Sequence, residues 1–412
     1  MPILLQISIE VNSGSVGRIA EQIGEQAIRS GWSSYITYAR NHNPSSSNII
    51  KIGTKWDVYS HGLETRLFDN HGFGSRSATI ALTERIREIN PDIIHLHHLH
   101  GYFINIEILF RFLKESGIPV VWTFHDCWAF TGHCAYFEYV GCEKWKTGCY
   151  ACEQKKEYPK SLWADRSVKN YADKKRIFNS LDNLTLIPVS HWLGNRVSES
   201  FLAGYPMEVI HNGVDLSEFY PKNSRSKIDS LFHVGNRFII LGVASTWDRR
   251  KGLDHFVQLY NCLDPQRFSM MLVGLSPSQI RSLPPGIVGL ERTESVSDLA
   301  DLYSAADVFV NTTLDDTFPT VNLEALACGT PVITYRSGGS PESISSDTGV
   351  VLEKGDVEGI VKAIVKMRDL GSNHYVNNCR ESAVANFENI KMFGCYMELY
   401  NTLLNEKVST GV

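Results

Sequence analysis

Residues 315–332, with the sequence DDTFPTVNLEALACGTPV, constrain the fold of this chain more than any other stretch. They predict a loop, a short helix and a buried strand, in that order. Pro319 suits the first position of a helix, because its missing N–H would be unpaired there in any case. Gly329 suits the end of that helix, where glycine readily adopts the left-handed conformation. A strand then follows from Val332.

The helix predicted after Pro319 offers a site for an anion. The N–H groups of Thr320 and Val321 point outward from its N-terminus, where the helix dipole favours negative charge. Asp316 and Glu324 bracket this position as two carboxylates. Carboxylates accept hydrogen bonds from sugar hydroxyls and a helix end can hold a diphosphate, so the pattern indicates a sugar-nucleotide site. An ordinary capped helix in an α/β domain is the alternative.

The same residues resemble the signature of the retaining glycosyltransferases of family 4, which have the two-domain GT-B fold. That signature is an acid, seven residues, Glu, Ala, a hydrophobic residue, Ala and a Gly-x-Pro-Val turn. Glu324 matches the second acid. Asp316 stands where the family usually has Glu, so this carboxylate is one methylene shorter. The resemblance implies that both acids contact the donor.

Composition and the N-terminal sequence predict a globular protein that is not secreted. A chain of 412 residues predicts about two to three domains. Its net charge of -5 argues against nucleic-acid binding, and no apolar run approaches the ~18–20 residues that span a bilayer. The N-terminus begins directly as a strand, without the basic region and cleavage site of a signal peptide. The nine cysteines are therefore expected as reduced thiols or metal ligands.

Short apolar runs alternate with helical periodicity twice along the chain, which predicts parallel sheets covered on both faces. We therefore expect an α/β chain of the GT-B class, with two doubly wound Rossmann-like domains facing across a cleft. Residues 1–205 form the expected acceptor-side domain, with a cysteine-rich insert at 127–160, and residues 206–387 form the nucleotide-sugar-binding domain. The last helix, 388–412, is expected by resemblance to cross back to the first domain. The polar stretch 41–48 is expected to be a loop.

Transfer of a sugar requires a stabilised diphosphate leaving group. Arg249, Arg250 and Lys251 follow a predicted strand and precede a helix. The resemblance places Lys251 on the donor phosphates, while Thr246 occupies the position of a family arginine. We expect Arg250 to replace that arginine, with Arg249 as the alternative. The turn 338–342, GGSPE, resembles the family turn that shapes the floor of the donor pocket.

Two features of the first half complete the expected active site. Gly14 and Gly17 form a loop between the first strand and helix, where the resemblance implies a donor-binding role and a tight turn is the alternative. His125 follows a strand and matches a family histidine that contacts the donor sugar. Retention with the departing phosphate as base needs no side-chain nucleophile, so His125 would orient the sugar. The nearby histidines are expected in the core or at its rim rather than as metal ligands; they are His95, His97, His98 and His100.

Four cysteines, Cys134, Cys142, Cys149 and Cys152, have the spacing Cys-x7-Cys-x6-Cys-x2-Cys. The closing Cys-x2-Cys suits a thiolate knuckle and four thiolates suit a structural Zn²⁺. Disulfides or free thiols are the alternatives. A similar insert occurs in a subset of the family that makes bacterial polysaccharides, including colanic acid. Cys127 falls outside the series and is expected to be a buried thiol.

Residues 144–176 hold ten Lys/Arg and four Asp/Glu with aromatic residues between them. This composition suits a peripheral contact with the inner face of an anionic membrane, and a solvated face over a small core explains it equally well. The leading hypothesis is a hexosyltransferase that uses a UDP- or GDP-sugar and a polyprenyl-diphosphate-linked oligosaccharide acceptor in bacterial surface polysaccharide synthesis. We expect this hexosyltransferase to need no cofactor for catalysis. A sugar-nucleotide epimerase of the same fold and a zinc-dependent nucleic-acid-binding module are the alternatives.

Overall fold

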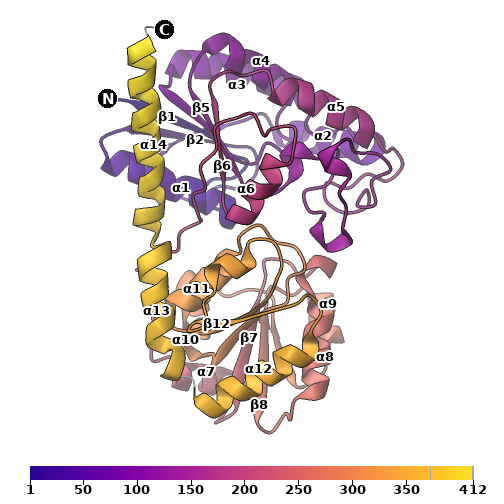
Figure 1. Ribbon diagram of the computed structural model, residues 1–412, viewed down its shortest axis with the longest axis vertical. Coiled ribbons are helices and arrows are strands. Elements are labelled where there is room, and N and C mark those ends of the chain that lie inside the picture. The colour runs from indigo at the N-terminus through magenta and orange to yellow at the C-terminus, as the bar shows by residue number, and fades with distance from the viewer. Residues whose placement is uncertain (372, 411–412) are drawn as a thin grey trace. The chain divides into compact units, whose positions relative to one another are not determined.

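The computed structural model describes residues 1–371 and 373–410 (Figure 1). The chain divides into two compact units. The first contains Met1–His211 and the described part of Ile390–Val412, and the second contains Asn212–Asn389. The first unit extends past the expected boundary at 205, because Met207 bridges to Leu186 and Ile210 is buried in its core. Among the described helices, none is long and apolar enough to cross a membrane.

The first unit is built on a six-stranded sheet in the order β3-β2-β1-β4-β5-β6. Every neighbouring pair in this sheet is parallel. Helices lie on both sides of the sheet (Figure 1), so strands β4, β5 and β6 are buried along their whole length. Its strands are β1 (Ile3–Ile7), β2 (Ser33–Tyr38), β3 (Asn48–Lys51), β4 (Ile93–Leu96), β5 (Val120–Phe124) and β6 (Leu184–Pro188). Its helices are α1 (Gly14–Arg29), α2 (Lys55–Phe68), α3 (Arg76–Ile89), α4 (Ile106–Ser116), α5 (Ser167–Phe178), α6 (His191–Ser198) and α14 (Asn389–Thr410).

Helix α14 belongs to the first unit although it ends the chain. Phe393, Tyr396 and Tyr400 are buried on one of its faces and join the core around Leu4 and Ile93. Two tyrosine hydroxyls of this helix also make buried hydrogen bonds: Tyr396 to Thr123 at 3.0 Å and Tyr400 to His95 at 2.6 Å. The helix is thus held by apolar packing and by polar contacts to β4 and β5.

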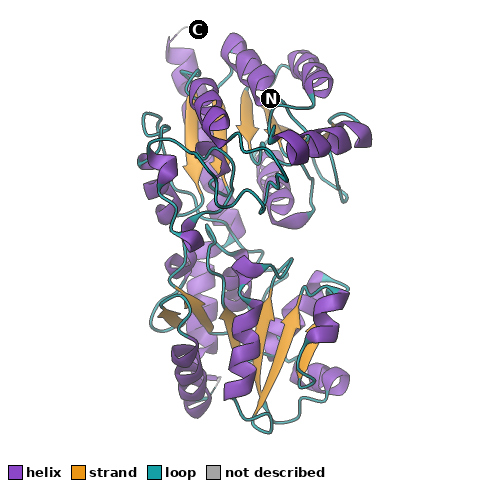
Figure 2. Cartoon of the chain, turned by 90° about the vertical axis from the view of Figure 1, so that its right-hand side faces the viewer, coloured by secondary structure: helices purple, strands orange, loops and turns teal. Residues whose placement is uncertain are grey.

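The second unit repeats the plan with a six-stranded sheet in the order β12-β11-β10-β7-β8-β9. All of its strand pairs are parallel, and helices again lie on both sides (Figure 2). Its strands are β7 (Phe238–Val243), β8 (Phe268–Val273), β9 (Ile287–Leu290), β10 (Val308–Asn311), β11 (Val332–Tyr335) and β12 (Gly349–Leu352). Its helices are α7 (Arg225–Phe232), α8 (Leu253–Cys262), α9 (Pro277–Ser282), α10 (Val296–Ala305), α11 (Thr320–Ala327), α12 (Val357–Leu370) and α13 (Asn373–Phe387).

Both sheets have the strand order of a doubly wound Rossmann fold, which confirms the predicted fold class. In such sheets the strand order reverses at one point, and ligands bind beyond the carboxyl ends of the strands there. This switch point lies between β1 and β4 in the first unit and between β7 and β10 in the second. The loops that follow these strands are therefore the first places to look for a site.

The polar stretch 41–48 is a loop, as predicted, up to its last residue, and two elements that the sequence did not reveal follow it. Strand β3 begins at Asn48 and pairs with β2, although it lies at the edge of the sheet and its side chains are largely exposed. Helix α2 follows, begun by a capping box in which Thr54 and Asp57 bond each other's backbone. Neither element buries a continuous apolar stripe, so hydrophobic periodicity did not reveal it.

Candidate active site

A partly buried ion pair marks the switch point of the second unit. Lys251, after β7, places its Nζ 2.6 Å from the Oδ2 of Asp316, after β10. Arg250 lies behind this pair, with Nη1 3.8 Å from the same carboxylate and 2.6 Å from the Asp315 carbonyl oxygen. Burial alone would raise the pKa of the Asp316 carboxyl, but Lys251 and Arg250 hold it below its usual value. The site therefore presents two cations gathered around one carboxylate.

Helix α11 begins just after this ion pair. Thr320 is its first residue and Pro319 precedes it with an extended backbone, so the proline stands one position earlier than predicted. The N–H groups of the first turn, Thr320 and Val321 among them, have no carbonyl partner within the helix. Glu324 lies one turn further on, is 7% exposed, and accepts a 3.0 Å hydrogen bond from the Tyr303 hydroxyl. Sequence reasoning did not anticipate Tyr303, which comes from α10.

The turn 338–342 holds the backbone of Asp316. Gly338 has φ +53°, and a Cβ added there would lie 1.7 Å from the Asp316 carbonyl oxygen. That same oxygen accepts a 3.1 Å hydrogen bond from the Gly339 N–H. Asn322 secures the other end of the turn through Ser340, at 3.0 Å. Gly338 is thus required for a close backbone approach beside the ion pair.

Replacing Gly338 with Ala should destabilise the protein and lower its activity. The left-handed backbone costs alanine about 1–2 kcal/mol, and the clash with Asp316 adds to this cost. Gly355→Ala is the matched control, because Gly355 has φ +83° with nothing within 4 Å of an added Cβ. Chemical denaturation should show the larger loss for Gly338→Ala. Equal losses for both variants would contradict the proposed backbone contact.

His125, in the first unit, follows β5 and is 8% exposed. Its Nε2 lies 3.2 Å from the Nδ1 of His97, and the two rings stack with centroids 5.4 Å apart. Burial, followed by the neighbouring His98 and His97, lowers the pKa of His125 well below its usual value. The ring is therefore neutral at physiological pH, which suits a group that orients a sugar by hydrogen bonding rather than one that carries charge.

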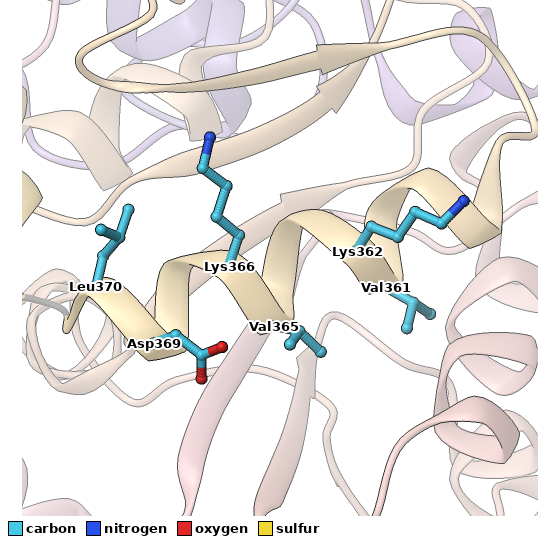
Figure 3. A pocket seen from close by; sticks show the side chains of 6 residues that line it. All are labelled: Val361, Lys362, Val365, Lys366, Asp369 and Leu370. Carbon is cyan, nitrogen blue, oxygen red and sulfur yellow. The ribbon is translucent and has the colours of Figure 1, made fainter.

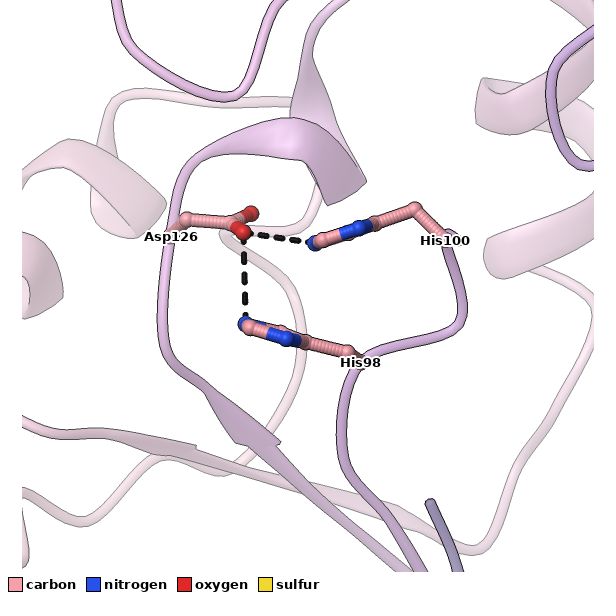
Figure 4. Close-up of side chains that lie close together, drawn as sticks. All are labelled: His98, His100 and Asp126. Atoms are coloured by element: carbon pink, nitrogen blue, oxygen red, sulfur yellow. Dashed lines mark hydrogen bonds and ion pairs between the residues drawn. The ribbon is translucent and has the colours of Figure 1, made fainter. Parts of the chain in front are cut away.

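The other histidines form a network around β4. His95 and His97 are buried and hydrogen-bonded to Thr123 and Gln6, at 2.7 and 2.9 Å. Asp126 contacts two more, with its Oδ2 2.6 Å from Nε2 of His100 and 3.3 Å from Nε2 of His98 (Figure 4). The atoms of this last group lie within 4.8 Å of one another, close enough for a metal. Sequence reasoning placed these histidines in the core but missed their meeting with Asp126.

The glycine loop after β1 is explained largely by packing. Gly14 opens α1 with φ +63°, and a Cβ there would lie 3.0 Å from the Glu10 carboxylate. A Cβ on Gly17 would lie 3.1 Å from the Glu10 carbonyl oxygen, so this glycine lets the helix approach the end of β1. Ser13 precedes the helix without capping it by its side chain. A role for either glycine in donor binding remains a prediction.

The cysteine-rich loop brings its four thiols to one small cavity. Cys134, Cys142, Cys149 and Cys152 line it together, and none of them forms a disulfide. Cys134 and Cys152 share a side-chain hydrogen bond. The four Sγ atoms do not form a group as tight as the one around Asp126. Cys127 is buried outside the cavity, as the spacing predicted.

A further hollow lies along α12 (Figure 3). All of its lining residues come from one face of that helix, and none is a predicted site residue. They are Val361, Lys362, Val365, Lys366, Asp369 and Leu370. The hollow therefore adds nothing to the site at the switch point.

Two parallel six-stranded sheets of this strand order define a fold of the GT-B class. Family models for "Glycosyltransferase Family 4" and "Glycosyl transferases group 1" match residues 16–218 and 237–369. The chain belongs to glycosyltransferase family 4.

Known proteins agree with this assignment. The chain is 23% identical over 389 residues to the putative colanic acid biosynthesis glycosyl transferase WcaC of Escherichia coli, covering 87% of this chain and 89% of the relative. A GDP-mannose-dependent mannosyltransferase of Corynebacterium glutamicum is 28% identical, but the match covers only 47% of this chain and 55% of that protein. Among solved structures, sucrose-phosphate synthase of Thermosynechococcus elongatus matches with a TM-score of 0.73 and 18% identity, over 98% of this chain and all of that one. Anabaena HepE in complex with UDP-glucose matches with a TM-score of 0.66 and 15% identity, over 99% of both chains.

Proposed function

We propose that this glycosyltransferase moves a hexose-type sugar, with retention of configuration, from a UDP- or GDP-sugar to a polyprenyl-diphosphate-linked oligosaccharide. The ion pair between Lys251 and Asp316 at the β7/β10 switch point carries this proposal. Two relatives support the chemistry: WcaC is named for colanic acid biosynthesis and HepE was solved with UDP-glucose. The expected setting is bacterial surface polysaccharide synthesis in the cytoplasm.

Each residue of the second unit has a distinct part in this proposal. The diphosphate accepts hydrogen bonds from the N–H groups at the start of α11. The positive charges of Lys251 and Arg250 attract it and stabilise it as the leaving group. Asp316 holds Lys251 in place and accepts from a hydroxyl of the donor sugar. Glu324 accepts from the ribose hydroxyls, with Tyr303 fixing its orientation.

The chemical step then needs no protein nucleophile. As the bond between the anomeric carbon and the phosphate oxygen breaks, the departing phosphate takes the proton of the acceptor hydroxyl on the same face. The acceptor oxygen bonds to the anomeric carbon from that face, so configuration is retained. His125, neutral and held by His97, keeps its predicted contact with the donor sugar. The two cations supply the charge compensation, so we propose transfer without a catalytic metal.

A panel of UDP- and GDP-sugars, incubated with the protein and a lipid extract, tests this function. We expect one donor to release its nucleoside diphosphate and to yield a product heavier by one sugar. The anomeric proton of the new linkage, followed by NMR, should keep the configuration of the donor. An inverted product would contradict retention. An isomerised donor without transfer would instead identify a sugar-nucleotide epimerase.

An exposed aromatic surface on the first unit supports a membrane-bound acceptor. Trp56, Tyr59 and Leu63 follow one another at helical spacing along α2 and are 78, 65 and 47% exposed. The N–H of Leu162 donates a 2.8 Å hydrogen bond to the Arg66 carbonyl oxygen, which brings Leu162 and the 75% exposed Trp163 beside the end of this helix. Lys55 and Arg66, both exposed, belong to the same helix, and the exposed Lys160 precedes residues 162–163 in the chain. Such a surface suits the headgroup region of an anionic bilayer.

The residues 144–176 contribute less to the exposed aromatic surface than their composition predicted. Trp145 and Tyr171 are buried, and Lys174 is buried with them, so part of that stretch is a small core. Tyr158 is 41% exposed, but its hydroxyl bonds His100 at 2.7 Å. The membrane surface that we propose therefore consists of one face of α2 and the neighbouring residues 162–163.

Replacing Trp56 and Trp163 together with Ser should weaken binding to vesicles that contain phosphatidylglycerol. Burial of a large apolar side chain contributes about 1.5–3 kcal/mol, so we expect a loss of at least about tenfold in affinity. Tyr220→Ser in the second unit, at a residue 43% exposed, is the control. Cosedimentation measures the effect. Equal binding by the wild type and the double variant would exclude this surface.

A further inference from the structure

A fully buried lysine lies under the cysteine-rich loop. Lys174, on α5, is 1% exposed, and its Nζ donates to the carbonyl oxygens of Trp128 at 2.7 Å and Thr131 at 3.0 Å. The same Nζ lies 3.5 Å from the centre of the Trp128 indole. Within the described residues it pairs with no carboxylate. A buried ammonium without a counter-charge is strongly unfavourable, so a negative charge is expected nearby.

The cysteine thiols are placed to supply that charge. Burial lowers the pKa of the Lys174 ammonium to about 7, whereas negative charge on the neighbouring Cys149 and Cys134 raises it. Cys149 also accepts a 3.1 Å hydrogen bond from the Gly132 N–H. A Cβ on Gly132 would lie 2.7 Å from the Cys149 Cβ and 2.2 Å from the Ser167 carbonyl oxygen. The cysteine-rich loop therefore packs closely against the start of α5.

A histidine at the same cavity has a free nitrogen. The Nδ1 of His133 lies 2.6 Å from the Oδ1 of Asp69, and both side chains are wholly buried. The Nε2 of His133 is buried without a hydrogen-bond partner, and the residue lines the cavity with the four cysteines. A carboxylate behind a histidine is the usual outer-shell arrangement at metal sites. The cavity thus combines thiols, a buried cation and an oriented imidazole.

We propose that Cys134, Cys142, Cys149 and Cys152 bind one Zn²⁺ as thiolates, with Lys174 as the buried counter-charge. Each thiol releases its proton to solvent as its sulfur bonds the metal, so four protons leave per ion. Four thiolates and one Zn²⁺ carry a net charge of -2, and Lys174 offsets one unit of it. Cys142, Cys149 and Cys152 are only partly buried. Binding requires the four sulfurs to come closer together than they lie in this structure. His133 lines the same cavity outside the set of four thiols, with its Nδ1 held by Asp69.

This site would fix the turn that follows His125 in the chain. The two carbonyl oxygens bound by Lys174 belong to the 3-10 turn Trp128–Phe130 and the residue that follows it. Asp126 anchors the same turn by accepting a 2.8 Å hydrogen bond from the Trp128 N–H. Loss of the metal should therefore loosen residues 126–132. Lys174 is a positioning residue in this account, not a catalytic one.

Metal analysis of the purified full-length chain tests the proposal without reference to transfer activity. We expect about one Zn²⁺ per chain in the wild type and a loss of at least about tenfold in Cys142→Ser and Cys152→Ser. Cys262→Ser, at an exposed thiol of the second unit, should keep the metal. His133→Gln should also keep it. Loss of zinc in His133→Gln with retention in Cys142→Ser would overturn the ligand set.

Two measurements on the wild-type protein keep the test independent of variant folding. Titration with a mercurial thiol reagent should release zinc in step with four thiols, as a chromophoric chelator reports. Exchange with Co²⁺ should give the intense visible and near-ultraviolet bands of tetrahedral cobalt thiolate. Nine reactive thiols without bound metal, or two disulfides in freshly purified protein, would overturn the proposal. On metal removal, amide exchange should accelerate in residues 126–132.

Discussion

Replacing Lys251 with Gln should lower kcat for sugar transfer by about 10²–10³-fold, the usual cost of removing one group that stabilises the charge of a transition state. The leaving diphosphate gains charge as its bond to the sugar breaks. Lys251 is placed to meet that charge from a partly buried position, with its Nζ held 2.6 Å from the Oδ2 of Asp316. Gln keeps a hydrogen-bond donor of similar length but removes the positive charge. Steady-state kinetics with the donor found in the panel measures the loss.

Variants of the two neighbouring arginines, Arg249 and Arg250, test whether the loss is specific to Lys251. Arg249 is exposed, so Arg249→Ala should leave kcat near that of the wild type. Arg250→Ala should give an intermediate loss, because Arg250 lies 3.8 Å from Asp316 and also bonds the backbone beside it. A larger loss for Arg249→Ala than for Arg250→Ala would reverse the assignment of the second phosphate cation. Full activity in Lys251→Gln would contradict the leaving-group role.

Replacing Glu324 with Ala should weaken binding of the nucleoside diphosphate by about 10- to 100-fold, because hydrogen bonds to a charged group contribute about 1.5–3 kcal/mol each. This loss of affinity should exceed that of Lys251→Gln, since Glu324 acts on the bound donor and Lys251 mainly on the transition state. Isothermal titration measures both. Unchanged affinity in Glu324→Ala would exclude its contact with the ribose.

The variant Tyr303→Phe separates the effect of Glu324 on nucleotide affinity from its effect on the stability of the fold. It removes only the hydroxyl that donates to Glu324 at 3.0 Å, and it leaves the ring in place. We expect a smaller loss of affinity than in Glu324→Ala. Thermal unfolding of both variants should be compared, because removal of one partner leaves a buried polar group unsatisfied. A loss of affinity that follows the loss of stability in both would point to unfolding instead of a lost contact.

The fold could be predicted largely from hydrophobic pattern. Strands such as β7 and β8 are buried apolar runs, and parallel sheets covered on both faces leave that signal in the sequence. The exposed edge strand β3 and the weakly amphipathic helix α2 leave no such signal. The order of strands in each sheet depends on pairings between distant segments, which periodicity does not report.

The candidate site was predictable one residue at a time but not as a set of contacts. Lys251, Asp316 and Glu324 were found because each stands in a local motif. The ion pair between Lys251 and Asp316 joins loops after two different strands, so only the folded sheet brings it together. The meeting of Asp126 with His98 and His100 is a further example.

A structure of the complex with UDP or GDP, whichever raises the melting temperature more, tests the central claim most directly. The account predicts the diphosphate at the N-terminus of α11, on the N–H groups of Thr320 and Val321. The ammonium of Lys251 should reach a phosphate oxygen, and Glu324 should accept from the ribose. A nucleotide bound elsewhere, with the Lys251–Asp316 pair and Glu324 free of contact with it, would contradict the account.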